Sequence, residues 1–357
     1  MTDHVIVVGG GIIGASIAYY LTEVGARVTV LEKAMPAHGA SGKSFGWINA
    51  NAAETANYYK LRREAIYEYL RLCESLDMTG AVKWDGSLWW EDQGQELLHQ
   101  AHVMQSYGYE AKIIDEAKFS ALEPNVANPP AHCILGSIEG AADGIEMVRL
   151  LLNGAARNGA DIVVGCNVSG PIRDEGNIVG INSNLGPVFG DKVVMATGAW
   201  SQEMLAGFGV DLPMDNKIGV IVHCLPVAPV VDHIIMSPDI HFRQDMSGRI
   251  IMGEIFSGGG LDQVTSESPV DFSHKMLERL KSRLPDVKNL VIDRVMVGKR
   301  PVPMGGMPAV GFVNGLYLAV MHSGITLAPL IGKLMALDII EGQVSDLLSD
   351  FRPTRFG

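Results

Sequence analysis

The stretch Val5-Ile6-Val7-Val8-Gly9-Gly10-Gly11-Ile12-Ile13-Gly14 decides the fold. Its first four residues are continuously apolar, which is typical of a strand buried on both faces of a parallel sheet. The glycines that follow fit the pattern G-x-G-x-x-G, and residues 15–24 have the apolar spacing of a helix. A second short strand is expected over 27–31. This strand–turn–helix–strand unit is the context that a dinucleotide-binding turn requires.

The chemistry of the turn suits a dinucleotide. Gly9 permits the tight turn, Gly11 lets the backbone approach a pyrophosphate, and Gly14 lets the helix pack closely on the strand. The N-terminus of the helix offers free N–H groups and a partial positive charge to phosphate oxygens. Glu32 closes the second strand, where its carboxylate would accept hydrogen bonds from an adenosine ribose and repel a 2′-phosphate. FAD and NAD both use such a turn, so the turn alone does not choose between them.

Length and composition exclude several classes of protein. The chain has 357 residues, and its 28 basic and 40 acidic side chains leave a net charge of −12. This balance argues against a nucleic-acid partner, because phosphate neutralisation needs clustered Lys and Arg. With 47% hydrophobic and 19% charged residues, the chain has enough apolar material for a core, which excludes a disordered protein. A chain of this length favours two domains.

Cysteine use and hydropathy indicate a cytoplasmic protein without an integral membrane segment. Cys73, Cys133, Cys166 and Cys224 form no C-x-x-C pair and no zinc spacing, so free thiols in a reducing compartment are expected. The N-terminus has no basic region and no cleavage site of a signal peptide. The most apolar late stretch, 309–340, is interrupted by polar and charged residues and is therefore a poor membrane span.

The order of the expected elements divides the chain into five segments. An α/β rhythm occupies 1–80, returns at 143–215 and again at 297–357, whereas 81–142 and 216–296 favour antiparallel strands. We therefore expect a nucleotide-binding domain in three segments, with a sheet-rich domain inserted twice. Long helices are predicted at Tyr58–Leu76, Met147–Asn158, Ser273–Leu284 and Thr326–Glu341.

Further segments carry the resemblance to a family. They are Val7–Gly14, Leu31-Glu32-Lys33, Ala40-Ser41-Gly42, Val194–Ser201, Lys299–Pro303, Met307–Gly311 and Gly324–Pro329. In order and spacing they resemble the D-amino-acid oxidase superfamily of FAD-dependent oxidoreductases, which includes glycine oxidase, sarcosine oxidase and D-amino-acid dehydrogenase. The resemblance covers nearly the whole chain. It implies an α/β fold, α+β overall, with a Rossmann-like FAD-binding domain and an inserted antiparallel-sheet substrate domain.

The resemblance also implies a flavin site. The cofactor-binding residues expected from it are Gly9, Gly11, Ile12, Ile13, Gly14, Glu32, Lys33, Ser41, Gly42, Lys43, Ser44, Gly46, Trp47, Val168, Ala196, Thr197, Gly198, Trp200, Arg300, Ser323, Gly324, Ile325 and Thr326. Members with covalent flavin use a cysteine in the C-terminal segment or a histidine near the N-terminus. The cysteines lie elsewhere and His4 precedes the first strand, so we predict non-covalent FAD.

Three residues, Arg300, His322 and His241, are predicted to serve catalysis. Arg300 matches the arginine that holds the substrate carboxylate in the family, and a guanidinium can bind a carboxylate through two parallel bonds. His322 and Ser323 are expected beside the flavin, on the turn before a helix whose positive end can stabilise an anionic reduced ring. We expect Pro329 in the first turn of that helix, where its missing N–H costs little. His241 stands where the family often has an aromatic residue, on the substrate side.

The predicted reaction is removal of a hydride from the C–H beside the amine of a small amino acid or secondary amine, of the D-amino acid, glycine or sarcosine type. The resulting imine would hydrolyse, and oxygen or another acceptor would take the electrons. The strand Arg249–Glu254 lacks the oxygen-activating lysine of sarcosine oxidase, which favours a dehydrogenase. Oxidation of a 2-hydroxy acid or polyol, and a flavoprotein subunit of an electron-transfer complex, remain as alternatives. The oligomeric state is left open.

Overall fold

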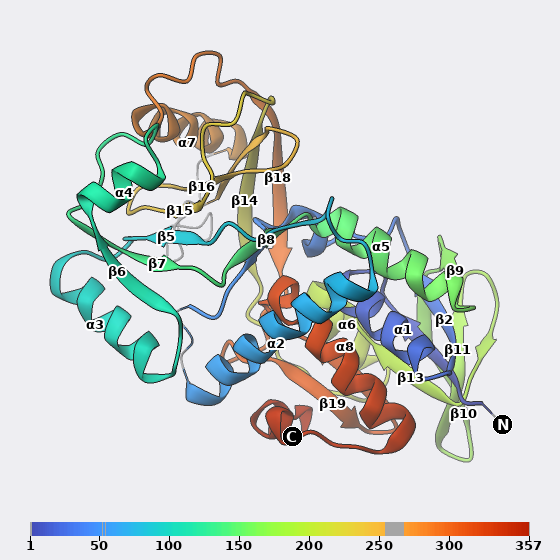
Figure 1. The fold of residues 1–357 in the computed structure, drawn as a ribbon. Helices are drawn as coiled ribbons and strands as arrows, with labels where there is room; N and C mark the ends of the chain where they lie inside the picture. The colour runs from blue at the N-terminus through green and yellow to red at the C-terminus, as the bar shows by residue number, and fades with distance from the viewer. Residues whose placement is uncertain (1, 52, 54, 254–267, 357) are drawn as a thin grey trace.

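Two large sheets organise the chain. The computed structural model describes residues 2–51, 53, 55–253 and 268–356. One sheet has six strands in the order β19-β20-β13-β1-β2-β9, and the other has eight in the order β18-β14-β17-β16-β15-β5-β7-β6. Figure 1 shows them as two lobes, with β14 and β18 lying between the lobes. This mixed α/β arrangement confirms the predicted fold class.

The six-stranded sheet contains the strand that opens the sequence. Its strands are β1 (His4–Val8), β2 (Arg27–Glu32), β9 (Asp161–Val164), β13 (Lys192–Met195), β19 (Ala309–Val313) and β20 (Leu316–Val320). All neighbours are parallel except β19 and β20. Val5 and Val7 join the apolar core on one face of the sheet, whereas Ile6 and Val8 join the core on the other. The continuous apolar pattern therefore reflects burial on both faces, as predicted.

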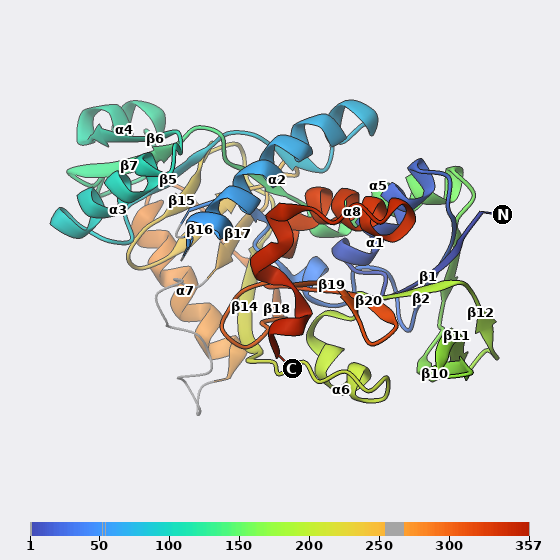
Figure 2. The same cartoon turned by 90° about the horizontal axis from the view of Figure 1, so that it is seen from below.

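Helices cover one face of this sheet. They are α1 (Ile12–Glu23), α2 (Ala56–Ser75), α5 (Gly144–Arg157) and α8 (Gly324–Glu341). Figure 2 shows α1, α5 and α8 on one face, and α6 (Ser201–Ala206) with the strands β10 (Val168–Asp174), β11 (Asn177–Ser183) and β12 (Val188–Phe189) on the other. Where α1 meets α8, the Ser16 hydroxyl donates to the Ala328 carbonyl at 2.6 Å. Gly332 faces Ser16 so closely that any side chain there would collide with it.

The eight-stranded sheet draws on two distant parts of the chain. Its strands are β5 (Ser87–Trp89), β6 (Ala111–Asp115), β7 (His132–Gly136), β14 (Lys217–Cys224), β15 (Ile234–Met236), β16 (His241–Gln244), β17 (Ile250–Gly253) and β18 (Ile292–Arg300). All neighbours are antiparallel except β5 and β15. The helices of this lobe are α3 (Gly94–Ser106), α4 (Glu116–Leu122) and α7 (Pro269–Arg283). Because β5 pairs with β15, residues near 90 lie beside residues near 240.

Short elements complete the chain. A small sheet joins β3 (Trp47–Ile48), β8 (Gly140–Ala142) and β4 (Val82–Lys83). The 3₁₀ helices are η1 (Ala40–Lys43), η2 (Gly198–Trp200), η3 (Asp346–Phe351) and η4 (Pro353–Phe356). The five-segment division stays our proposal for the domains. Strand β18 crosses its boundary at 296/297, so the two lobes share a continuous strand there.

The four predicted long helices are present, with shifted ends. The shift of α8 matters most, because the helix begins at Gly324 rather than Thr326. Pro329 therefore lies inside the helix, and its expected place in the first turn is wrong. A proline there leaves the carbonyl of Ile325 without its helical N–H donor. The hydroxyl of Tyr69, from α2, donates to this carbonyl at 2.5 Å and replaces the missing bond.

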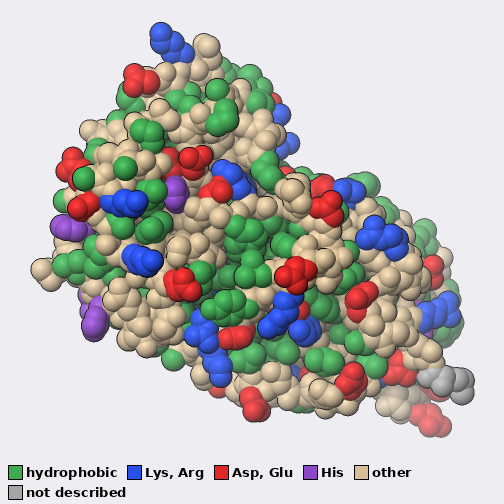
Figure 3. All heavy atoms as spheres, in the orientation of Figure 1, with side chains coloured by type: hydrophobic (Ala, Val, Ile, Leu, Met, Phe, Trp, Pro, Cys, Tyr) green, Lys and Arg blue, Asp and Glu red, His purple; other side chains and the backbone are tan. Residues whose placement is uncertain are grey.

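Surface features agree with the charge balance of the sequence. On the face shown in Figure 3, acidic and basic side chains alternate without a continuous basic patch. Below the surface, the buried Glu68 on α2 pairs with Arg71 and with Lys333 of α8. No helix in the described part of the chain combines the length and apolar character needed to cross a bilayer. The four cysteines are free thiols; Cys133, Cys166 and Cys224 are buried and Cys73 is half-buried.

Candidate active site

A cavity of about 880 Å³ lies where the two lobes meet. Residues from both large sheets line it, including the ends of β1, β2 and β13, the N-terminus of α8, and β14 and β18. The carboxyl ends of parallel strands face one edge of a sheet, which is where α/β proteins bind nucleotides. Segments near residues 9, 197 and 324 are thereby brought to a single cavity.

The glycine turn has the geometry that its sequence predicts. Gly9 has a φ of 110° and a side chain there would strike the carbonyl of Ala196. A side chain on Gly14 would strike the carbonyl of Gly9, so α1 can approach β1 only with glycine at this position. Gly11 is the N-cap of α1 and carries no side chain that would cover the helix end. The turn therefore exposes the N-terminus of α1 to the cavity.

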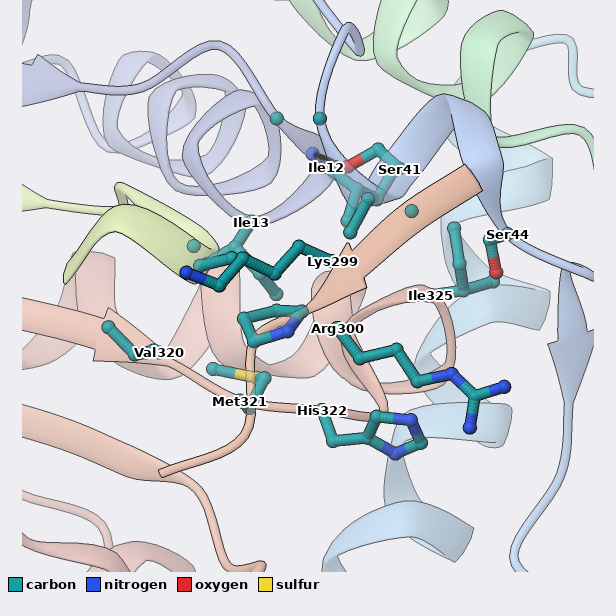
Figure 4. Close-up of a pocket in the computed structure, with 18 of the residues that line it drawn as sticks. Ile12, Ile13, Ser41, Ser44, Lys299, Arg300, Val320, Met321, His322 and Ile325 are labelled. Atoms are coloured by element: carbon teal, nitrogen blue, oxygen red, sulfur yellow. Dashed lines mark hydrogen bonds between the residues drawn. The ribbon is translucent and has the colours of Figure 1, made fainter. Parts of the chain in front are cut away.

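Two polar side chains already organise this end of the cavity. The Ser41 hydroxyl accepts a hydrogen bond from the backbone N–H of Ile12 at 2.9 Å, as Figure 4 shows. The carboxylate of Glu32 accepts the N–H of Gly10 at 2.7 Å and the N–H of Ala34 at 2.8 Å. Both side chains also line the cavity. They lie where a pyrophosphate and a ribose would be held if the turn binds a dinucleotide.

The N-terminus of α8 forms the opposite wall. The Thr326 hydroxyl donates to the Trp47 carbonyl at 3.3 Å and accepts the N–H of Asn49 at 3.2 Å. The hydroxyl of Tyr58 donates to that of Ser323 at 3.0 Å. These bonds join α8 to the segment around 47–49 and place the positive end of the helix dipole at the cavity.

Most of the residues predicted for the site meet in this cavity. All of them line it except Gly14, Gly42 and His241. Gly14 and Gly42 lie behind the lining, and a side chain on Gly42 would press on the carbonyl of Ala37 at 2.5 Å. His241 is buried on β16 and does not line the cavity. No described contact assigns a role to any of these residues, so their functions stay predictions.

Arg300, the last residue of β18, and His322, two residues after the end of β20, lie close together in the cavity, as Figure 4 shows. The guanidinium group of Arg300 lies over Gly219 of β14, where an added Cβ would be 2.7 Å from its Nε. Glycine at this position therefore leaves room for the guanidinium. Burial and the positive charges of Arg300 and Arg62 lower the pKa of His322 to about 4. His322 is therefore neutral at pH 7.

Sequence reasoning missed several residues of the lining. Glu91 follows β5 and occupies the cavity wall in front of His241, with its Oε2 3.1 Å from the Nε2 of that histidine. Arg62 of α2 also lines the cavity and donates to the carbonyls of Asn49 at 3.1 Å and Asn51 at 2.8 Å. Lys299 extends beside Ile13 in Figure 4. The sequence carried no motif that could have identified Glu91 or Arg62.

A fully buried acid, Glu139, supports the wall from behind. It accepts hydrogen bonds from the indole N–H of Trp47 and the hydroxyl of Ser87, each at 2.6 Å, and from the hydroxyl of Tyr109. Burial raises the pKa of Glu139 to about 7, despite these donors. Trp47 is thus held in the cavity wall by a side chain that never reaches the cavity itself.

The residues present fit an FAD molecule. The cavity joins an exposed helix N-terminus and a strand-end carboxylate at one end to the N-terminus of a second helix at the other. The first pair suits a pyrophosphate and a ribose, and the second helix end suits a ring that becomes anionic on reduction. Glycine in place of a side chain keeps the turn open where the pyrophosphate would approach.

Comparisons with known proteins agree with this arrangement. A family model described as FAD dependent oxidoreductase matches residues 4–337. The chain is 28% identical to the uncharacterized oxidoreductase YurR of Bacillus subtilis (strain 168), over 98% of each chain. It is 26% identical to a glycine oxidase of Bacillus licheniformis, over 94% of this chain and 92% of the other.

Solved structures share the fold. An L-proline dehydrogenase from P. horikoshii superposes with a TM-score of 0.87 at 22% identity, covering 99% of this chain and 98% of the other. A glycine oxidase from Bacillus cereus ATCC 14579 has a TM-score of 0.85 at 24% identity, covering 98% of both chains. At these identities the likeness establishes the fold.

Proposed function

The chain belongs to the FAD-dependent oxidoreductase family, and from this premise we propose that it oxidises a small amino acid or secondary amine. The substrate is of the D-amino acid, glycine or sarcosine type. A hydride leaves the C–H beside the amine, and the resulting imine hydrolyses. FAD, bound without a covalent link, supplies the hydride acceptor. Oxygen or another acceptor then takes the electrons.

The position of Arg300 is the observation that carries this proposal. Its guanidinium group lies in the cavity, over the bare backbone of Gly219 and beside His322. A guanidinium can hold a carboxylate through two parallel charge-assisted bonds, which restricts how the substrate turns. Fixing the carboxylate in this way determines which C–H bond faces the cofactor.

Other cavity residues have supporting roles in the proposal. His322 is neutral at pH 7, so it can accept or donate a hydrogen bond without competing with Arg300 for the carboxylate. The N-terminus of α8, from Ser323 to Thr326, lies where it can stabilise negative charge. Hydride loss is driven by the lone pair of a neutral amine, so no side chain is assigned as a general base. Glu254, which ends the strand compared with sarcosine oxidase, lies outside the described residues.

Anaerobic bleaching of the flavin tests the reaction. Purified protein is mixed with D-amino acids, glycine, sarcosine, proline analogues and 2-hydroxy acids, and the loss of flavin absorbance is recorded. We expect amines to reduce the flavin. Reduction by hydroxy acids alone would instead support the second enzyme class. Peroxide formation in air, compared with reduction of an artificial acceptor, separates an oxidase from a dehydrogenase.

Two variants test the role of Arg300. Arg300→Ala removes the guanidinium, and Gly219→Ala keeps it but places a methyl group where it lies. Both are expected to raise the KM of a carboxylate substrate, on the order of tenfold or more for Arg300→Ala, while FAD stays bound. Gly170→Ala is the control, because this strand glycine has open space around it. An unchanged KM in both variants would remove Arg300 from the proposal.

A further inference from the structure

Glu91 places a carboxylate in a cavity whose other charged groups near the substrate end are cationic. It comes two residues after Trp89, the last residue of β5, and its side chain is only 9% exposed. The cavity-lining acids among the described residues are Glu32, Glu91 and Glu203, and of these only Glu91 comes from the eight-stranded lobe. A carboxylate that has lost most of its water is costly unless a cation or hydrogen-bond donor faces it.

The pairing of the strands places Glu91 near Arg300. The carboxylate of Glu91 reaches across β15 to His241 on β16, where its Oε2 lies 3.1 Å from Nε2. The guanidinium of Arg300 lies over β14. Only β17 separates β14 from β16, so the two charged groups lie over strands about 10 Å apart. A positive and a negative group therefore line the same cavity, over two strands of one sheet with a single strand between them.

This separation suits a small zwitterion. A substrate carboxylate bound to Arg300 and a substrate ammonium bound to Glu91 would each make an N–O contact of about 3 Å. The space left between the two side chains would suit a short molecule that carries both groups. A 2-hydroxy acid offers the same carboxylate to Arg300 but only a neutral hydroxyl to Glu91. The charge pattern therefore distinguishes the two substrate classes.

We propose that Glu91, which lies beside His241, binds the nitrogen of the incoming substrate in its cationic form and makes the cavity select amines over 2-hydroxy acids; this nitrogen gives its proton to water before the hydride leaves. The inference rests on the proposed function and names the residue that sets its substrate class. Glu91 is the specificity-determining group, because it faces the ligand. His241 is assigned as a positioning residue, because its Nε2 lies 3.1 Å from the Oε2 of Glu91 and its side chain does not line the cavity.

Matched ligand pairs test the inference under anaerobic conditions, in which a ligand that is oxidised reduces the flavin only once and a ligand that is not oxidised only perturbs its spectrum; the concentration dependence of either change gives the binding constant. Glycine is compared with glycolate and D-alanine with D-lactate, and binding to the holoenzyme is followed by the change in flavin absorbance under anaerobic conditions. Glu91→Gln keeps the shape of the side chain and removes its charge. Asp92→Asn is the matched control, because it removes the same charge from the neighbouring residue, which does not line the cavity.

We expect Glu91→Gln to weaken binding of the amino acids by about 10- to 100-fold, the range for a hydrogen bond to a charged group. Binding of the hydroxy acids is expected to stay the same or become tighter, and Asp92→Asn should change neither. His241→Asn should weaken amine binding less than Glu91→Gln does.

Three results would overturn the inference. The first is an equal loss for amino and hydroxy ligands in Glu91→Gln, which would show that the residue only maintains the fold. The second is amine binding by wild-type protein that is no tighter than binding of the hydroxy partner. The third is amine binding that is unchanged in Glu91→Gln while amines still bleach the wild-type flavin, which would leave the proposed function standing and remove only this inference.

Discussion

Two ionisable residues near the cavity have pKa values displaced in opposite senses. The pKa of His322 is lowered to about 4 by burial and by the charges of Arg300 and Arg62, whereas burial raises the pKa of Glu139 to about 7. The unfolded chain would protonate a histidine near 6.5 and a glutamate near 4.3. Both displacements therefore fall in the same pH window, roughly 4.5–6.5, but with opposite effects on stability.

The signs follow from proton uptake. For His322 the unfolded state binds more protons in this window, so stability rises with pH; for Glu139 the folded state binds more, so stability falls with pH. We predict that Glu139→Gln makes the free energy of unfolding rise more steeply with pH, and that His322→Gln makes it fall. Each change amounts to about 3 kcal/mol across the window. Urea titrations at several pH values measure the free energy of unfolding. If its plots against pH are parallel for the wild type and both variants, the prediction is contradicted.

At the scale of elements, α8 depends on its neighbours for its first turns. Pro329 removes one helical bond, and the Tyr69 hydroxyl supplies a substitute donor to the Ile325 carbonyl. The Ser16 hydroxyl of α1 binds the Ala328 carbonyl from another side. The residues that this helix presents to the cavity, Ser323 to Thr326, are thus held by bonds from α1 and α2.

Tyr69→Phe tests this support. The ring of Tyr69 is fully buried, so the change alters little except the hydroxyl and leaves the Ile325 carbonyl without that donor. We expect a loss of about 1–3 kcal/mol in the free energy of unfolding, and weaker FAD binding because the start of α8 loosens. Tyr59→Phe on the same helix is the control, since its buried hydroxyl makes no hydrogen bond with the described residues. Equal stability of the two variants would contradict this interpretation.

At the scale of the whole molecule, one cavity draws its walls from both lobes. Its lining extends from Val8 and Gly9 of the six-stranded sheet, through α2, to Arg300 and the start of α8. A ligand that fills it therefore contacts segments that are far apart in the chain. Binding of such a ligand stabilises the folded state of all of them together.

We predict that FAD raises the melting temperature of the apoprotein by several degrees. At a concentration 100-fold above Kd, the stabilisation is about 2.7 kcal/mol. Circular dichroism and tryptophan fluorescence should report the same shifted transition, because residues of both lobes line the cavity. FMN is the control: it lacks the adenosine that would reach Glu32, so it should shift the transition less. Equal shifts with FAD and FMN would show that the Glu32 end of the cavity does not bind the cofactor.

Local sequence was enough to predict the dinucleotide turn and its surroundings. Spacing over ten residues specifies how Gly9, Gly11 and Gly14 allow the chain to turn and the helix to approach, and the structure has this geometry. Buried strands and amphipathic helices were also predictable from local sequence, because the spacing of their apolar residues repeats within a short stretch of chain. The predicted start of α8 and the place of Pro329 in its first turn were wrong, because the helix accommodates Pro329 through a donor from α2.

The substrate end of the cavity depends on contacts between distant segments. Glu91 meets His241 because β5 pairs with β15, and Arg300 can lie in the cavity because a glycine occupies the neighbouring strand. Glu139 likewise accepts hydrogen bonds from Trp47, Ser87 and Tyr109, and these four residues come from separate parts of the chain. Such pairings are selected by packing of the complete core and leave no local pattern, so the charges that line this end of the cavity come together only when the two lobes are assembled.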